Sequence, residues 1–285
     1  METFRLSNGY EIPVIGYGTY PQKESLPRNL VNAYRAGYRL FDTSDNYDNE
    51  AYLGEGLTEI DRNDCVVITK YSRSMGEVHF ADAFKNSRDK LKSNPDIYLL
   101  HWPYPFLWKY HWRQMEKLYL AGEVKAIGVC NFEVDKLEAL LRFCKVPPVI
   151  DQIERHPLFQ QKDIVEYCDS HDIRVMSYSP VARGNKELME SPVLKEIAGK
   201  YNKSIGQIIL RWDIDTGTIP IPGASGEDHI RDNIDIFDFE LTDEELGRIS
   251  ELDSGVRIRF APKTRFTLKQ KIQFLIKRLI LILIG

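Results

Sequence analysis

The sequence predicts an α/β protein with the fold of a (β/α)₈, or TIM, barrel, in which parallel strands alternate with helices. Two observations predict it. Short runs rich in Val, Ile, Leu and Tyr alternate with runs in which apolar residues recur every three or four positions. About eight such alternations in roughly 250 residues match the usual size of this barrel. A doubly wound sheet is the alternative, but no Gly-x-Gly-x-x-Gly motif follows the first strand-like run.

The predicted strands are short and apolar, as expected of strands that are buried on both faces. In chain order they are residues 14–19, 39–43, 66–70, 97–101, 124–130, 149–153, 174–177 and 218–221. An N-terminal β-hairpin is expected before them, over residues 4–12. Asn8 and Gly9 suit the positive φ angles of a type I′ turn at its tip.

The predicted helices follow from the three- and four-residue spacing of apolar side chains. They are residues 25–36, 80–91, 112–121, 134–143, 163–171 and 192–201. Gly37 and Gly122 follow two of them, where a helix commonly ends in a left-handed residue. Pro192 suits a first helical turn, whose N–H groups have no partner within the helix.

Composition is that of an ordinary globular protein, with 43% hydrophobic and 28% charged residues, and it excludes a disordered or collagen-like chain. We expect one barrel over residues 1–253, followed by a C-terminal loop and tail over residues 254–285. The four cysteines show neither a CxxC pair nor a Cys/His metal spacing, so we expect a reducing compartment and no metal.

Charge is unevenly distributed along the chain. Residues 254–285 hold eight basic and no acidic side chains, whereas the remainder holds 30 basic and 42 acidic ones, a net charge of −12. An acidic body does not suit nucleic acid as a partner. The N-terminus lacks the pattern of a signal peptide, and no stretch of about 20 apolar residues occurs. A cytoplasmic location is therefore expected.

Polar residues stand at the ends of six consecutive predicted strands. They are Asp42, Lys70, His101, Asn131, Gln152 and Tyr178. Each alone has an ordinary structural explanation, such as a turn cap for an aspartate or a solvated strand end for a lysine. Together they would project into one mouth, because the active site of this fold lies at the C-terminal ends of its strands.

An Asp, a Lys and a Tyr that converge in a partly dry pocket make a general acid. If Asp42 holds the Lys70 ammonium beside Tyr47, the ammonium stabilises the phenolate and the pKa of the tyrosine falls from about 10. A neutral His101 nearby orients a carbonyl oxygen. These four residues are the predicted catalytic group.

Ordered motifs along residues 4–253 resemble those of the aldo-keto reductase family. They are GYGT at 16–19, DTSDNYDNE at 42–50, ITK at 68–70, DIYLLHWP at 96–103, GEVKAIGVCNF at 122–132, QIERHP at 152–157, YSP at 178–180 and QIILRW at 207–212. The resemblance implies a catalytic tetrad of Tyr47, Asp42, Lys70 and His101, in which Tyr47 is the proton donor to an aldehyde or ketone. It also implies hydride transfer from a reduced nicotinamide.

The resemblance assigns further residues to the cofactor. Asn131 and Gln152 match contacts to the nicotinamide carboxamide, Tyr178 the aromatic under the ring, and Ser179 a contact to the pyrophosphate. The other matched positions are Thr19, Gly223, Ala224, Asp232 and Asn233.

The sequence departs from the family pattern at two places. Cys130 stands where the carboxamide site usually has Ser, and Gly223-Ala224 with His229 stand where many members have the Lys, Ser and Arg that hold a 2′-phosphate. Because other branches with Ile-Pro-Gly still use NADP(H), this cofactor is favoured, with NAD(H) as the alternative.

Aromatic residues are expected around the carbonyl substrate, with Tyr20, Trp102 and Tyr104 as the pocket residues. Phe106, Trp108 and Tyr110 follow in the same loop, and the alternative for Phe106 and Trp108 is that they simply pack it. The tetrad favours an enzyme that reduces carbonyl compounds. The alternative is a nicotinamide-binding, redox-sensing subunit with little turnover, which has no need to keep Tyr47 and Lys70 together.

The tail predicts a basic amphipathic helix after a loop, beginning near residues 257–260, that closes over the substrate. One face holds Ile272, Leu275, Ile276, Leu279, Ile280 and Leu283, and the other holds Lys269, Gln273 and Lys277. Such a helix suits peripheral contact with an anionic membrane surface. The alternative is that its apolar face packs on the barrel or on a second subunit.

Overall fold

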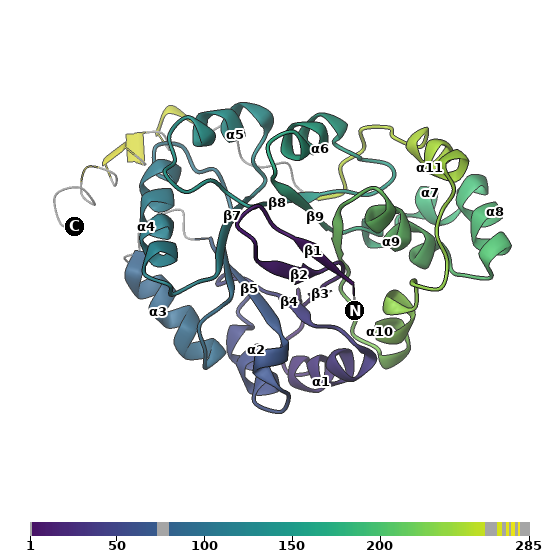
Figure 1. Cartoon of the computed structure of the whole chain (residues 1–285), viewed down its shortest axis with the longest axis horizontal. Coiled ribbons are helices and arrows are strands. Elements are labelled where there is room, and N and C mark those ends of the chain that lie inside the picture. Colours follow the sequence, from purple (N-terminus) through teal and green to yellow (C-terminus); the bar gives the residue numbers. More distant parts are fainter. Residues whose placement is uncertain are drawn as a thin grey trace.

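The computed structural model describes residues 2–72 and 80–259 and, in the tail, residues 267–269, 272–273, 275–276 and 279. Within these residues, eight parallel strands stand side by side in chain order and are surrounded by helices (Figure 1). The strands are β3 (Tyr17–Gly18), β4 (Leu40–Asp42), β5 (Val66–Tyr71), β6 (Ile97–Leu100), β7 (Ala126–Cys130), β8 (Ile150–Glu154), β9 (Arg174–Tyr178) and β10 (Ile219–Ile221). The predicted barrel is confirmed, and each strand coincides with a predicted one.

The first and last strands close the sheet into a barrel. A parallel bridge joins Gly18 to Gly223. The N–H of Gly16 donates to the carbonyl of Pro220 at 3.0 Å, and that of Gly18 to Pro222 at 2.9 Å. The approach is close: a Cβ on Gly18 would lie 3.0 Å from the carbonyl oxygen of Ile221. Glycine here lets the two backbones meet.

Helices cover the outside of the barrel, and all six predicted ones are present. Across the described residues they are α1 (Leu26–Ala36), α2 (Glu50–Leu57), α3 (Phe80–Leu91), α4 (Trp108–Leu120), α5 (Val134–Leu141), α6 (Lys162–Asp169), α7 (Lys186–Met189), α8 (Pro192–Tyr201), α9 (Ile205–Asp215), α10 (Glu227–Ile234) and α11 (Asp243–Ser250). Gly37 ends α1 at φ 113° and Gly122 follows α4 at φ 71°. Both are left-handed, as predicted.

Some of the helices in the structure were not predicted from the sequence: α2, α7, α9, α10 and α11. Two of them begin with capping boxes, Ser204 with Gln207 and Thr242 with Glu245. In each box the hydroxyl accepts from an N–H of the first turn while the third residue's side chain returns to the cap. These pairs are the sequence signal that would have marked α9 and α11.

Helix α2 packs so closely on α3 that it needs a glycine. A Cβ on Gly54 would lie 2.1 Å from the carbonyl oxygen of Lys90, a backbone atom that cannot rotate away. We therefore expect Gly54→Ala to lower the free energy of unfolding by about 1–3 kcal/mol. Gly247 in α11 has no atom near such a Cβ, so Gly247→Ala should raise stability by about 0.5–1 kcal/mol. Urea unfolding of both variants checks the opposite signs, and two changes of equal sign would contradict this packing.

The predicted N-terminal hairpin is confirmed as β1 (Thr3–Arg5) paired antiparallel with β2 (Glu11–Pro13). The predicted type I′ turn is wrong. Gly9 has a positive φ of 85°, but Asn8 is not left-handed, and the N–H of Gly9 donates to the carbonyl of Leu6. The Asn8 side chain instead accepts from the N–H of Tyr10 and donates to the carbonyl of Lys125. The side-chain amide of Asn8 therefore links the hairpin turn to the barrel.

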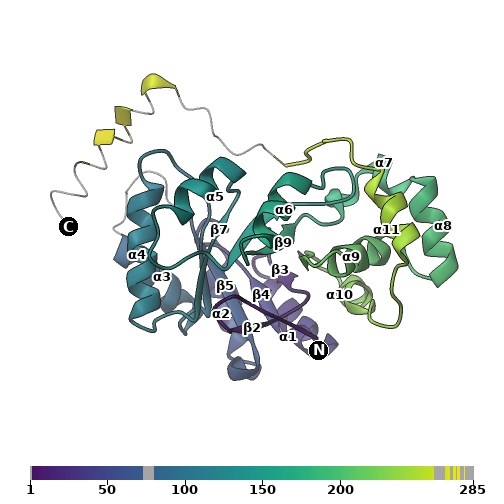
Figure 2. The same ribbon diagram turned by 45° about the horizontal axis from the view of Figure 1, so that its top comes forward.

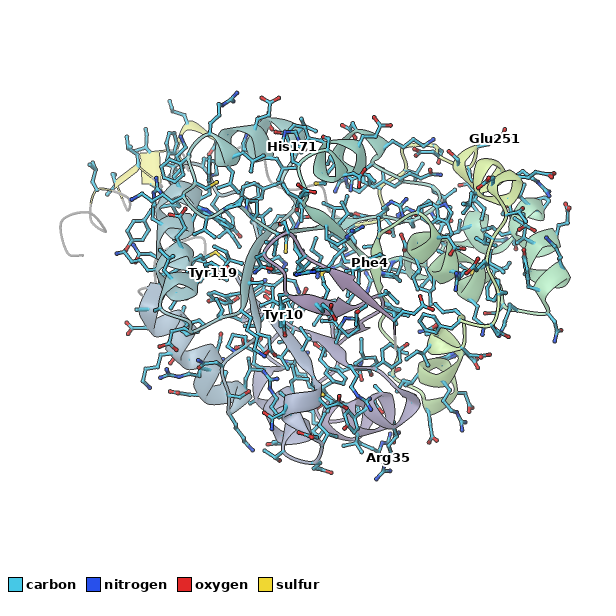
Figure 3. The ribbon with its side chains drawn as sticks, in the orientation of Figure 1. Phe4, Tyr10, Arg35, Tyr119, His171 and Glu251 are labelled. Atoms are coloured by element: carbon cyan, nitrogen blue, oxygen red, sulfur yellow. The ribbon has the colours of Figure 1, made fainter. Side chains whose placement is uncertain are left out.

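This hairpin covers the N-terminal ends of the strands. Leu6 and Ile12 are buried in the cluster that fills the barrel interior. Phe4 and Tyr10 lie over the centre of the barrel in Figure 3. The ring of Phe4 faces Arg174 at the start of β9. The ring of Tyr10 faces Lys125 at the start of β7. Because this end is plugged, access to the interior is from the C-terminal ends.

The described tail residues run outside the barrel (Figure 2). Helical backbone is present at several of them, and the apolar side chains of Leu268, Ile272, Leu275, Ile276 and Leu279 are 43–74% exposed. The other predicted members of the tail faces, Ile280, Leu283 and Lys277, lie outside the described residues, as does Phe260. Over the residues that the structure describes, no helix is long and apolar enough to cross a membrane.

Candidate active site

The C-terminal ends of the strands surround a pocket of about 470 Å³. Its lining includes these predicted residues: Thr19, Tyr20, Asp42, Tyr47, His101, Trp102, Asn131, Gln152, Tyr178, Ser179 and Gly223. A wider groove of about 1120 Å³ runs beside the hairpin at the opposite end of the barrel and contains none of the predicted site residues. We place the candidate site in the smaller pocket, because the ionisable groups converge there.

Lys70 and Asp42 form a buried ion pair under the pocket floor. Strand β5 is buried along its whole length, so the Lys70 side chain has no exposed surface. Its Nζ donates to Asp42 Oδ2 at 2.6 Å and to the carbonyl of Thr43 at 2.9 Å. Asp42 Oδ1 accepts from Gln152 Nε2 at 2.8 Å. Burial alone would lower the pKa of Lys70, but the Asp42 carboxylate raises it above its ordinary value, and the ammonium stays charged.

Tyr47 lies in the loop between β4 and α2, with its hydroxyl 3.5 Å from Lys70 Nζ. Desolvation raises the pKa of Tyr47 to about 12, and the ammonium of Lys70 opposes that rise. The expected fall of this pKa is therefore not present here, because burial outweighs the single nearby cation. The phenol is protonated at neutral pH. The Lys70 ammonium lies beside the oxygen that would carry the negative charge of a phenolate.

His101 is held by two hydroxyls at the end of β6. Its Nδ1 lies 2.5 Å from Ser72 Oγ and 3.0 Å from Ser44 Oγ, and these two hydroxyls are 2.8 Å apart. The Ser44 hydroxyl also donates to Asn46 Oδ1 at 2.9 Å. Burial, with a smaller contribution from Lys70, lowers the pKa of His101 well below its ordinary value. The imidazole is neutral, and its Nε2 is the nitrogen left for a ligand.

Ser44 and Ser72 were missed in the sequence. They are separated from His101 by 57 and 29 positions, so no local spacing connects them. Ser72 follows β5 two residues after Lys70, and that strand-end position was the available signal.

An amide and aromatic group lines the other wall of the pocket. The hydroxyl of Tyr178 donates to Asn131 Oδ1 at 2.8 Å, and Asn131 Nδ2 donates to the carbonyl of His101 at 3.2 Å. Asn131 is left-handed at φ 60°, a conformation that asparagine adopts more readily than most residues. Cys130 is fully buried, and burial raises the pKa of its thiol well above the ordinary value. It therefore stays a neutral thiol.

Of the three aromatic residues predicted around the substrate, Tyr20 and Trp102 line the pocket and Tyr104 does not. Tyr20 is 46% exposed, and its ring centroid lies 5.0 Å from that of Tyr47. Trp102 stacks on His101 with 5.4 Å between ring centroids. Tyr104 is half-buried and is not in the pocket lining. Trp108 is buried in the core against Phe132 and Phe143, the packing alternative considered for it, and Phe106 is 41% exposed.

Four residues predicted to contact the cofactor follow the last strand of the barrel, β10. Gly223 lines the pocket, and the carbonyl of Ala224 accepts from the hydroxyl of Tyr17. Asp232 and Asn233 are on helix α10, outside the pocket lining.

Two arginines that were not predicted as binding residues also line the pocket, although Arg259 lies where the loop expected to close over the substrate begins. Arg183 follows β9 in a loop whose residues Ser179, Ala182 and Arg183 all have positive φ angles. Arg259 comes from the segment that precedes the tail. Both give the pocket positive charge that could hold an anionic ligand.

The chain resembles known proteins in sequence and in fold. The sequence model described as "Aldo/keto reductase family" matches residues 5–254. An uncharacterized oxidoreductase of Bacillus subtilis (strain 168) is 40% identical over 265 residues, which cover 89% of this chain and 93% of that protein. The glyoxal reductase of the same organism is 37% identical over 263 residues, covering 90% and 95%. The crystal structure of a Bombyx mori aldo-keto reductase in complex with NADP superposes with a TM-score of 0.84 at 32% identity, covering 91% of this chain and 95% of that one.

Proposed function

Because this chain belongs to the aldo-keto reductase family, we propose that it reduces an aldehyde or ketone to the alcohol with NADPH, and that Tyr47 donates the proton. The single observation that carries the proposal is the buried ion pair of Lys70 and Asp42 with the Tyr47 hydroxyl 3.5 Å from Lys70 Nζ. A charged ammonium that is fixed beside a protonated phenol stabilises the phenolate left after proton donation.

The pocket fits a nicotinamide dinucleotide by the chemistry of its donors. Asn131 and Gln152 offer amide groups to a carboxamide, and Tyr178 offers a ring face. Ser179 and Arg183 stand together on the β9 loop, where a hydroxyl and a guanidinium suit a pyrophosphate. When bound, the reduced nicotinamide supplies a hydride to the carbonyl carbon. These cofactor roles are part of the proposal.

NADP(H) is the proposed cofactor, with NAD(H) as the alternative. The Bombyx mori relative binds NADP. His229 is exposed on α10. It stands at the position where many members of the family carry the arginine that holds the 2′-phosphate. The proposal is tested by following NADPH and NADH oxidation with a panel of aldehydes. Turnover with kcat/KM higher for NADPH supports it. Tight cofactor binding without turnover of any aldehyde would favour the redox-sensing alternative.

His101 is proposed to present a donor to the substrate carbonyl. In this proposal the Ser72 hydroxyl, 2.5 Å from Nδ1, donates to that nitrogen and leaves the proton on Nε2, while the Ser44 hydroxyl donates to Asn46 Oδ1. An Nε2–H donor and the Tyr47 hydroxyl then both face the carbonyl oxygen. Ser72 acts through His101 and is a positioning residue.

We expect Ser72→Ala to lower kcat by about tenfold, because a neutral hydrogen bond contributes about 0.5–1.5 kcal/mol. ¹⁵N NMR of the histidine should show a larger share of the Nδ1–H tautomer. Ser72→Thr keeps the hydroxyl and should retain both properties. An Ser72→Ala variant with the wild-type tautomer and rate would contradict this role.

We propose that residues 1–253 form the catalytic unit and that residues 254–285 form a loop and tail. The four cysteines are free thiols, which suits a cytoplasmic location. The two proposed uses of the tail are peripheral membrane contact and packing on the barrel or on a second subunit. Deletion of residues 269–285 separates them: loss of flotation with anionic vesicles supports the first, and a change in sedimentation supports the second.

A further inference from the structure

The pocket is lined by cations that its own carboxylate does not neutralise. Asp42 is the one acidic residue among its described lining residues, and it is paired with Lys70. Arg183 and Arg259 line the same pocket. Arg183 belongs to the wall proposed for the cofactor phosphates, so Arg259 is the cation that needs a separate explanation.

A buried carboxylate fixes the position of Arg259. Glu154 ends strand β8 and has no exposed surface. Its Oε1 accepts from the backbone N–H of Ile258 at 2.7 Å and from that of Arg259 at 2.8 Å. The Arg257 guanidinium lies 3.8 Å from Oε2 and over the ring of Phe159. Three consecutive residues are thus tied to the C-terminal edge of the barrel, and they bring Arg259 to the pocket.

The side chain of Arg259 lies on the catalytic side of the pocket. Its guanidinium carbon is 5.3 Å from the ring centroid of Tyr20, and that centroid is 5.0 Å from the centroid of Tyr47. The guanidinium is therefore within about 10 Å of the Tyr47 ring. Among the described residues no carboxylate forms an ion pair with it, and Glu154 contacts Arg259 through the backbone N–H alone.

We propose that Arg259 binds an oxyanion at the far end of the substrate, so that the enzyme prefers carbonyl compounds that also carry a carboxylate or a phosphate. This inference rests on the proposed carbonyl reduction. A guanidinium binds either oxyanion through two parallel N–H groups, and the ring of Tyr20 supports its planar face. With the carbonyl oxygen at Tyr47 and His101, the distance to Arg259 suits a small, two-ended substrate.

The experiment compares two pairs of substrates, each with one anionic and one neutral member. One pair is 4-carboxybenzaldehyde and methyl 4-formylbenzoate; the other is glyceraldehyde 3-phosphate and glyceraldehyde. The measured quantity is the ratio of kcat/KM for the anionic member to that for the neutral member, at saturating NADPH. We expect a ratio of about ten or more in at least one pair, falling with added salt, and the pair with the larger ratio identifies the oxyanion.

Arg259→Ala should lower this ratio about tenfold, mainly through KM of the anionic substrate. Arg259→Lys should recover part of it, since it keeps the charge without the planar fork. Arg142→Ala is the matched control, because it removes one positive charge from an exposed site outside the pocket. The ratio should not change in that variant.

An unchanged ratio in Arg259→Ala would overturn the inference. So would an effect confined to KM for NADPH, because Arg259 would then serve the cofactor. Absence of turnover with all four aldehydes is a different result. It would overturn the proposed function, and this inference with it, and is recognised in the wild-type protein before any variant is made.

Discussion

Replacing Tyr47 with phenylalanine is expected to lower kcat for carbonyl reduction by about 10²- to 10⁴-fold, the usual contribution of a positioned general acid. The ring stays, so its contacts with Tyr20 and His101 are preserved and only the hydroxyl 3.5 Å from Lys70 is lost. Steady-state kinetics with NADPH checks it, and NADPH fluorescence titration serves as the control for an intact site. A variant with near-wild-type kcat would show that another group donates the proton.

Tyr47 also determines how the rates of reduction and oxidation change with pH. The phenol is protonated below its pKa of about 12, so carbonyl reduction should hold through neutral pH and fall only as the pH rises toward that value. Oxidation of the alcohol needs the phenolate and should increase over the same interval. The low pKa of His101 leaves the imidazole neutral, so it should add no further change near pH 6.5. Opposite slopes for the two directions are the measurement.

Replacing Lys70 with methionine is expected to have the second large effect, on both activity and stability. It leaves the Asp42 carboxylate buried without its cation, which costs about 3–5 kcal/mol in the free energy of unfolding. It also removes the charge that opposes the rise of the Tyr47 pKa, so kcat should fall by about 10²-fold or more.

The paired variant Asp42→Asn with Lys70→Met separates the two effects. Without either charge, most of the lost stability should return, because no unpaired ion is left in the core. Activity should not return, because Tyr47 still lacks its ammonium. Urea unfolding and kinetics on the single and double variants give both quantities. Recovery of activity together with stability would assign Lys70 a purely structural role.

The barrel and the predicted tetrad could be anticipated from local patterns. Strand β5 is apolar before Lys70, and Asp42 ends strand β4, so the strand-end rule places both at the mouth without knowledge of contacts. The family motifs then add Tyr47, which lies in a loop that periodicity cannot place.

Other features depend on contacts between distant segments and could not be predicted. Ser44 and Ser72 meet at His101 only because three strands are neighbours in the barrel. Glu154 ties residues 258 and 259 across a separation of more than 100 positions. The sequence predicts a fall in the pKa of Tyr47 because it shows the nearby lysine and aspartate but not the degree of desolvation that burial imposes.

The most direct test of the central claim follows a deuterium atom. The protein is incubated with each of a panel of aldehydes and with NADPH that carries deuterium at both hydrogen positions of nicotinamide C4, and the products are examined by mass spectrometry. The account predicts one deuterium on the former carbonyl carbon with the wild-type protein, and a loss of most of that product with Tyr47→Phe. Binding of NADPH with no deuterated alcohol from any aldehyde would contradict it.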